Sequence, residues 1–124
     1  MEIHESAEDY LETVLMLKEQ KGQVRSIDIV NEMGYSKPSI SVAMKHLREN
    51  GYITMDEDGY ITLTEPGMEI ARHIYTKHKL LTKFLVSLGV GEKTAADDAC
   101  KIEHDISDET FEKLKEHAKQ HLSE

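Results

Sequence analysis

Apolar residues in the first part of the chain recur every three or four positions, the spacing that places them on one face of a helix. The first predicted helix runs from Ser6 to about Gln20 and closes near Gly22. Ser6 and Asp9 have the spacing of a capping box, so Ser6 is the expected N-cap. The positions that predict its buried face are Tyr10, Leu11, Val14, Leu15 and Leu17.

Two shorter helices with a tight turn between them are expected next. One covers about residues 27–33, with Ser26 as its N-cap and Gly34 as the glycine that ends it. The other follows the N-cap Ser36 and stops before Gly51, since glycine readily adopts the left-handed conformation that ends many helices. The predicted order so far is helix, helix, turn, helix.

Two short β-prone segments follow the third helix. They cover residues 52–55 and 60–64, and the stretch Asp56-Glu57-Asp58-Gly59 between them carries the Asp-Gly signal of a hairpin turn. Helices followed by a hairpin at these lengths predict a winged helix-turn-helix. In that fold the third helix is the recognition helix and the hairpin is the wing.

The second half of the chain returns to helical periodicity. Three helices are expected there: one from Pro66 to about Leu88, one from a capping box of Thr94 and Asp97 to about Asp105, and one from Ser107 to about Leu122. No linker rich in Pro, Gly or Ser separates the halves, so the predicted boundary near Thr64 is soft. The predicted fold class is mainly α, with a winged helix-turn-helix domain over residues 1–64 and an all-α dimerisation domain over residues 65–124.

Composition narrows the class of protein. The chain has 124 residues, of which 39% are hydrophobic and 31% charged, so a collagen, a disordered chain and a disulfide scaffold are excluded. A lone cysteine, a polar N-terminus and the lack of long apolar runs favour a cytosolic protein with no membrane segment. Two units this small bury little surface, so a homodimer is expected. The net charge of −9 argues mildly against nucleic acid, unless a local surface is basic.

The predicted recognition helix provides such a basic surface. Between residues 35 and 48 there are three basic side chains, Lys37, Lys45 and Arg48, and no acidic one. A positive surface of this kind favours contact with a phosphate backbone. A solvent-exposed helix face with ordinary caps would have the same sequence pattern. The residues assigned to contact double-stranded DNA are Arg25, Ser36, Lys37, Pro38, Ser39, Ser41, Val42 and Lys45.

Two features limit how this surface would read DNA. The wing tip, residues 56–58, is acidic and would be repelled by phosphates, so the tip is not expected to grip DNA. The exposed helix face also has no Asn, Gln or Arg for bidentate contacts with bases. Sequence preference would therefore depend on serine contacts, on Val42 against thymine methyl groups, and on DNA shape.

A possible metal site lies in the second half. Cys100, Glu103 and His104 are i, i+3 and i+4 on one predicted helix, which presents a thiolate, a carboxylate and an imidazole together. Asp9 and Glu12, at i and i+3 on the first helix, could complete the set. Each residue also has an ordinary structural role, because a lone cysteine is often a small buried hydrophobe and Asp9 suits a helix start. His78 lies beside an apolar stripe, where a hydrogen-bonded core histidine is more common than a ligand.

Three blocks of sequence resemble one known family. They are Ser6-Ala7-Glu8-Asp9-Tyr10-Leu11-Glu12, Lys77-His78-Lys79-Leu80-Leu81, and Ala99-Cys100-Lys101-Ile102-Glu103-His104 followed by Ser107-Asp108-Glu109. In this order they resemble the diphtheria toxin repressor family of metal-dependent transcriptional regulators. The resemblance covers essentially the whole chain, includes Ser36-Lys37-Pro38-Ser39, and is to the short, two-domain manganese transport regulator branch.

The resemblance implies a metal-dependent repressor of metal-uptake genes. It assigns the ligands Asp9, Glu12, His78, Cys100, Glu103 and His104. Asp9 is typical of the manganese regulators and Cys100 of the iron regulators, so the expected metal is Fe²⁺ or Mn²⁺, with Co²⁺, Ni²⁺ or Zn²⁺ possible in vitro. Thr82 and Ala96 stand where the iron regulators have Glu and His for an ancillary site, which therefore looks incomplete.

The expected mechanism is that one cation ties the first helix to the dimerisation domain. The two recognition helices of a homodimer would then fit successive major grooves of a palindromic operator. Two alternatives remain at this stage: a metal-independent winged-helix regulator, and a small metal-dependent hydrolase. The hydrolase has little support, because the chain contains no His-Glu-x-x-His motif and no phosphate-binding glycine loop.

Overall fold

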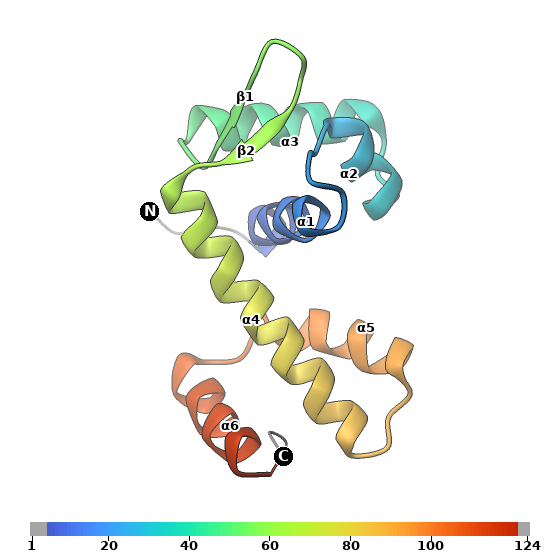
Figure 1. Cartoon of the computed structure of the whole chain (residues 1–124), viewed down its shortest axis with the longest axis vertical. Helices are drawn as coiled ribbons and strands as arrows, with labels where there is room; N and C mark the ends of the chain where they lie inside the picture. The colour runs from blue at the N-terminus through green and yellow to red at the C-terminus, as the bar shows by residue number, and fades with distance from the viewer. Residues whose placement is uncertain (1–4, 122–124) are drawn as a thin grey trace. The chain divides into compact units, whose positions relative to one another are not determined.

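The computed structural model describes residues 5–121 and is mainly helical, as predicted (Figure 1). The elements are α1 (Glu5–Lys21), α2 (Ser26–Met33), α3 (Lys37–Glu49), β1 (Ile53–Met55), β2 (Ile61–Leu63), α4 (Glu65–Ser87), α5 (Glu92–Ile102) and α6 (Asp108–His121). The chain forms two compact units that divide between His73 and Ile74, inside α4. Since α4 is continuous through this point, the domain boundary near Thr64 stays a prediction. The predicted end of the last helix, Leu122, lies outside the described residues.

The first unit is a three-helix bundle with a hairpin. Helix α1 contacts α2, α3 and β2, while β1 contacts α3, so the hairpin closes one side of the bundle (Figure 1). The apolar stripe predicted for the first helix is buried here except for Tyr10, which is half-buried. The core side chains that are almost fully removed from water are Leu11, Val14, Leu17, Val24, Ile29, Ile40, Met44, Ile53 and Ile61.

Most helix ends follow the predicted signals. Ser36 is the N-cap of α3, with its hydroxyl oxygen 3.3 Å from the backbone N of Ser39. Gly34 and Gly51 have φ angles of 75° and 81°, in the left-handed region where glycine has no steric penalty. Ser107 caps α6 and accepts a hydrogen bond from the N–H of Thr110 at 3.1 Å.

Three predicted helix starts are wrong. Ser6 lies inside α1, since Glu5 is already helical. Ser26 is the first residue of α2, and the extended residue before it, Arg25, is the N-cap. Thr94 lies inside α5, whose N-cap is Gly91, so its capping box with Asp97 does not open the helix. In the last two cases the cap is the last extended residue, a property of backbone conformation that a side-chain motif does not fix.

The N-terminus of α2 is held by Asp28. The Asp28 carboxylate accepts the N–H of Arg25 at 2.9 Å and a second hydrogen bond from the ammonium of Lys21 at 3.1 Å. The hydrogen bond from the Arg25 backbone, followed by the one from Lys21, holds the pKa of Asp28 below its ordinary value. This carboxylate therefore satisfies a backbone donor that no helical carbonyl can reach.

The hairpin has a regular antiparallel register. Ile53 pairs with Leu63, and Met55 pairs with Ile61. Asp56 shapes the turn, because its Oδ1 accepts the N–H of Asp58 at 3.0 Å and the N–H of Tyr60 at 2.9 Å. The predicted wing is thus present, and its tip is folded by one of its own acidic side chains.

The second unit contains the C-terminal part of α4 together with α5 and α6. Its core is small and is formed by Ile74, Leu81, Ala95, Ala99, Phe111 and Ala118. Within the described range, no helix has the combination of length and apolar character needed to cross a membrane.

Candidate metal centre and nucleic-acid interface

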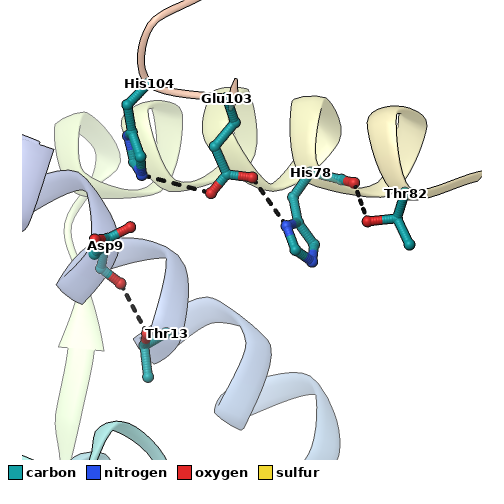
Figure 2. A network of polar contacts seen from close by, with 6 residues as sticks. All are labelled: Asp9, Thr13, His78, Thr82, Glu103 and His104. Atoms are coloured by element: carbon teal, nitrogen blue, oxygen red, sulfur yellow. Dashed lines mark hydrogen bonds and ion pairs between the residues drawn. The ribbon is translucent and has the colours of Figure 1, made fainter. Parts of the chain in front are cut away.

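A buried carboxylate lies between two histidines in the second unit. Glu103, the C-cap residue of α5, has no exposed surface. Its Oε2 lies 2.9 Å from Nδ1 of His78 on α4, and its Oε1 lies 3.5 Å from Nε2 of His104 (Figure 2). Two imidazoles from different parts of the chain thus flank one carboxylate.

The electrostatics of this cluster favour a cation. Removing a carboxylate from water is costly unless positive charge or hydrogen-bond donors compensate it. Within the described part of the chain, Oε1 of Glu103 has no hydrogen-bond partner, and the His104 contact is long for a hydrogen bond. One carboxylate and two imidazoles supply the oxygen and nitrogen donors that Mn²⁺, Fe²⁺ and Zn²⁺ accept. The residues present therefore fit a divalent transition metal.

Contacts made by Lys77 connect the two segments that carry these donors, which are α4 and the connection that follows α5. Lys77, next to His78, is buried, and its ammonium lies 3.3 Å from Oδ1 of Asp108 and 5.7 Å from the ring centroid of Phe111. The connection from Glu103 to Asp108 is thus attached at both ends to adjacent residues of α4. Lys77 was not among the predicted site residues. The sequence signal that could have identified it is a lysine on the apolar stripe of this helix, three residues after one apolar position and four before the next.

The sequence also named Cys100 and Thr82 in the second unit. Cys100 lies on α5 and is exposed to solvent. The helix ends at Ile102 and not near Asp105 as predicted, so His104 lies beyond the helix and not on a common helical face with Cys100. Thr82 donates its hydroxyl to the carbonyl oxygen of His78 at 2.7 Å, a hydrogen bond within α4 (Figure 2).

The two carboxylates predicted from the N-terminal block are on α1, in the first unit. Glu12 is buried and Asp9 is half-buried. The backbone carbonyl of Asp9 accepts the hydroxyl of Thr13 at 2.8 Å, which is drawn in Figure 2. Their membership of a metal site with the second-unit residues stays a prediction.

The recognition helix has the two faces that its sequence predicts. Ile40, Met44 and Leu47 are buried against the first-unit core, and Val42 on the other face is 54% exposed. The remaining residues assigned to DNA are all exposed: Arg25, Ser36, Lys37, Pro38, Ser39, Ser41 and Lys45. The Ser36 hydroxyl also donates to the Ser39 hydroxyl at 2.9 Å. Apart from Val42, the exposed face of α3 is therefore polar and basic, while DNA contact by these residues stays a prediction.

Comparison with known families matches both halves of the chain. Residues 2–61 match the family described as iron dependent repressor, N-terminal DNA binding domain. Residues 64–121 match the family described as iron dependent repressor, metal binding and dimerisation domain. The flanked carboxylate and its histidines thus fall in the part matched by a metal-binding domain, and α3 in the part matched by a DNA-binding domain.

Individual relatives agree with these matches. The chain is 40% identical over 113 residues to an uncharacterised HTH-type transcriptional regulator of Methanocaldococcus jannaschii, covering 90% of each chain. It is 31% identical over 117 residues to the transcriptional regulator MntR of Salmonella typhimurium, covering 94% of this chain and 74% of the relative. It also resembles a solved manganese-dependent transcriptional repressor in complex with manganese, with a TM-score of 0.81 and 28% identity. That match covers 90% of this chain, which spans about half (51%) of the solved structure.

Proposed function

The chain belongs to the iron-dependent repressor family, and we propose that it is a metal-dependent transcriptional repressor that binds duplex DNA as a homodimer. The family consists of transcriptional regulators, and both of its characteristic domains match this chain. We expect the protein to act in the cytoplasm on palindromic operators of metal-uptake genes.

One observation carries the metal dependence. Glu103 is completely buried, yet it is flanked by the ring nitrogens of His78 and His104 and has one oxygen with no hydrogen-bond donor among the described residues. A site built only for stability would satisfy both oxygens. A cation bound at this carboxylate would compensate its charge and use the oxygen that the protein leaves available.

We assign six ligands to the metal, of which three are supported by the contacts around Glu103 and three rest on the sequence. The assigned residues are Asp9, Glu12, His78, Cys100, Glu103 and His104. The carboxylates favour Mn²⁺ or Fe²⁺, whereas the Cys100 thiolate favours Fe²⁺, Co²⁺ or Zn²⁺. Fe²⁺ and Mn²⁺ are therefore the two proposed physiological metals.

The proposed switch follows from where the ligands lie in the chain. When bound, a divalent cation supplies positive charge that carboxylate, thiolate and imidazole ligands share. Asp9 and Glu12 belong to the unit that carries α3, and the other four ligands belong to the unit that matches the dimerisation domain. Ligands from both units would restrict how far apart a dimer holds its recognition helices. Successive major grooves require about 34–36 Å between them.

The proposal is tested by gel shifts on the upstream region of the protein's own gene. Mn²⁺, anaerobic Fe²⁺, Co²⁺ and Zn²⁺ are added in separate series. We expect retention of the labelled DNA only with metal, reversal by a chelator, and an order among the metals that identifies the preferred one. Equal retention with and without metal would mean a metal-independent regulator and would contradict the proposal.

A second arm tests the coupling between metal and DNA. Thermodynamic linkage requires that operator DNA tighten metal binding by the same factor as metal tightens operator binding. Metal titrations with and without operator measure that factor directly. Identical metal affinities in the two titrations would refute the coupling even if the protein binds both ligands.

A further inference from the structure

Arg25 holds an unusual position at the base of the wing. Its guanidinium carbon lies 4.3 Å from the ring centroid of Tyr60, the residue just before β2. This distance is well within the range of a cation–π interaction. The side chain just before α2 thus lies over the aromatic ring just before β2.

The backbone on both sides of this contact is fixed. The N–H of Ile61 donates to the carbonyl oxygen of Val24 at 2.7 Å, which joins β2 to the residue before Arg25. The N–H of Tyr60 donates to Asp56 at 2.9 Å. The N–H of Arg25 itself donates to Asp28 at 2.9 Å. The backbone segments that carry the Tyr60 ring and the Arg25 side chain are therefore held side by side.

The donors of the Arg25 guanidinium have no carboxylate acceptor among the residues that the structure describes. Asp28, whose carboxylate also feels the positive charge of Arg25, already accepts a backbone N–H and the ammonium of Lys21. A guanidinium has five N–H donors in a fixed planar arrangement that matches the oxygens of a phosphate, and a cation–π contact does not occupy them with an acceptor atom.

From this geometry we propose that Tyr60 is a positioning residue that holds Arg25 for contact with a backbone phosphate of duplex DNA. The proposal rests on the proposed function, since it deepens the DNA-binding role of the first unit. It also assigns the wing a role that its acidic tip, Asp56-Glu57-Asp58, would not have. The wing acts at its base, by orienting an arginine, and its acidic tip is not needed for contact with phosphates.

The stacking matters because a free arginine must lose side-chain entropy when it binds. Arginine is among the side chains with the largest rotamer entropy, and a side chain ordered before binding avoids much of that cost. Loss of a cation–π contact at an exposed site corresponds to a change of about two- to fivefold in an equilibrium constant. We expect the effect of Tyr60 on DNA affinity to be of that size.

The test compares Tyr60→Leu and Tyr60→Phe in the full-length protein, at saturating Mn²⁺, across a series of salt concentrations. Tyr60→Leu removes the aromatic face, and we expect it to weaken operator binding about two- to fivefold. Tyr60→Phe keeps that face and should bind like the wild type. Arg25→Ala should lower the slope of log affinity against log salt by about 1, the value for one lost phosphate contact.

A matched control is available in the second unit. Lys79 lies 4.1 Å from the ring centroid of Tyr75, a second cation–π pair on α4. Tyr75→Leu removes an aromatic ring of the same kind from a region assigned no DNA contact. Its operator affinity and salt slope should equal those of the wild type.

A double variant separates positioning from a purely structural role. In an Arg25→Ala background, Tyr60→Leu should cause no further loss of affinity, because its effect acts through Arg25. Additive losses, or a Tyr60→Leu variant that binds like the wild type, would overturn the proposal. If wild-type binding shows no metal dependence, the proposed function fails, whereas the Tyr60 comparison on duplex DNA still decides this inference. Absence of any DNA binding would overturn both.

Discussion

Replacement of Glu103 by glutamine is the most direct test of the metal centre. The amide has nearly the same shape as the carboxylate and can still hydrogen-bond to His78, so the fold should tolerate the change. What it removes is the negative charge at a site with no exposed surface. Glu103→Gln should therefore weaken metal binding far more than it disturbs the apoprotein.

The expected magnitude follows from linkage between binding and folding. At a free metal concentration of about 100 times its dissociation constant, the wild type gains about 2.7 kcal/mol of stability. Residues that only orient ligands change metal affinity by about 10- to 100-fold, so loss of a charged ligand should cost at least about 100-fold. At the same metal concentration the variant would then gain only about 0.4 kcal/mol. For a chain of 124 residues, these gains correspond to rises in Tm of roughly 10 °C and 1–2 °C.

The assay is thermal unfolding followed by circular dichroism, with free Mn²⁺ set by a metal buffer. Each variant is compared with its own metal-free form, so that changes in the apoprotein cancel. Glu116→Gln is the matched control, since Glu116 is an exposed carboxylate on α6 paired with Lys113 at 3.9 Å. Its metal-induced shift should equal that of the wild type. A Glu103→Gln variant that retains the full shift would refute the reasoning.

Three further predictions concern other parts of the chain. Gly67→Ala should destabilise the protein by about 1–3 kcal/mol in urea denaturation, because the added methyl group would collide with a backbone carbonyl. Asp28→Asn should have a lower free energy of unfolding than the wild type at pH 7, and this difference should vanish in acid. The folded pKa of Asp28 is lowered by a backbone N–H, so its contribution is present above the unfolded pKa of about 3.9 and is lost as pH falls through the folded value. Lys45→Ala, on the exposed face of α3, should lower the salt slope of operator binding by about 1.

Each of these predictions has a contrasting outcome. Gly91→Ala, where an added methyl group meets nothing within 4 Å, should cost less than about 1 kcal/mol, and a Gly67→Ala variant of equal stability would contradict the collision. A stability difference for Asp28→Asn that persists unchanged from pH 7 to pH 3 would mean that charge is not its cause. Lys113→Ala, in the second unit, should leave the salt slope unchanged, and an equal effect of both lysine variants would indicate a non-specific charge effect.

The local elements could be predicted from the sequence because short-range interactions decide them. The N-cap Ser36 and the left-handed Gly51 bound α3 as predicted, and the Asp-Gly signal at Gly59 gives the wing. Helix starts were predicted less well. Ser26 and Thr94 have the right chemistry for a cap, but the last extended residue is Arg25 in one case and Gly91 in the other. Backbone conformation before a helix depends on the path of the chain, which a cap motif does not encode.

The candidate metal site could likewise be predicted only in part. The sequence identified His78, Glu103 and His104 as possible ligands from their chemistry and from a family resemblance. From its position alone, His78 was more typical of a core histidine than of a ligand, because residues 25 positions apart have no spacing rule that relates them. Folding of α5 back against α4 places Nδ1 of His78 2.9 Å from Glu103.

The sequence by itself determined which donor groups the protein carries, where its helices and wing lie, and which face of α3 is basic, since composition and periodicity are local properties. Only the tertiary structure decided that Glu103 is removed from water between two imidazoles, that Lys77 is buried beside Asp108, and that Arg25 stacks on Tyr60. Burial and long-range pairing depend on how separate elements pack. That packing removes the Glu103 carboxylate from water and sets it between two histidines, where a bound cation would compensate its charge.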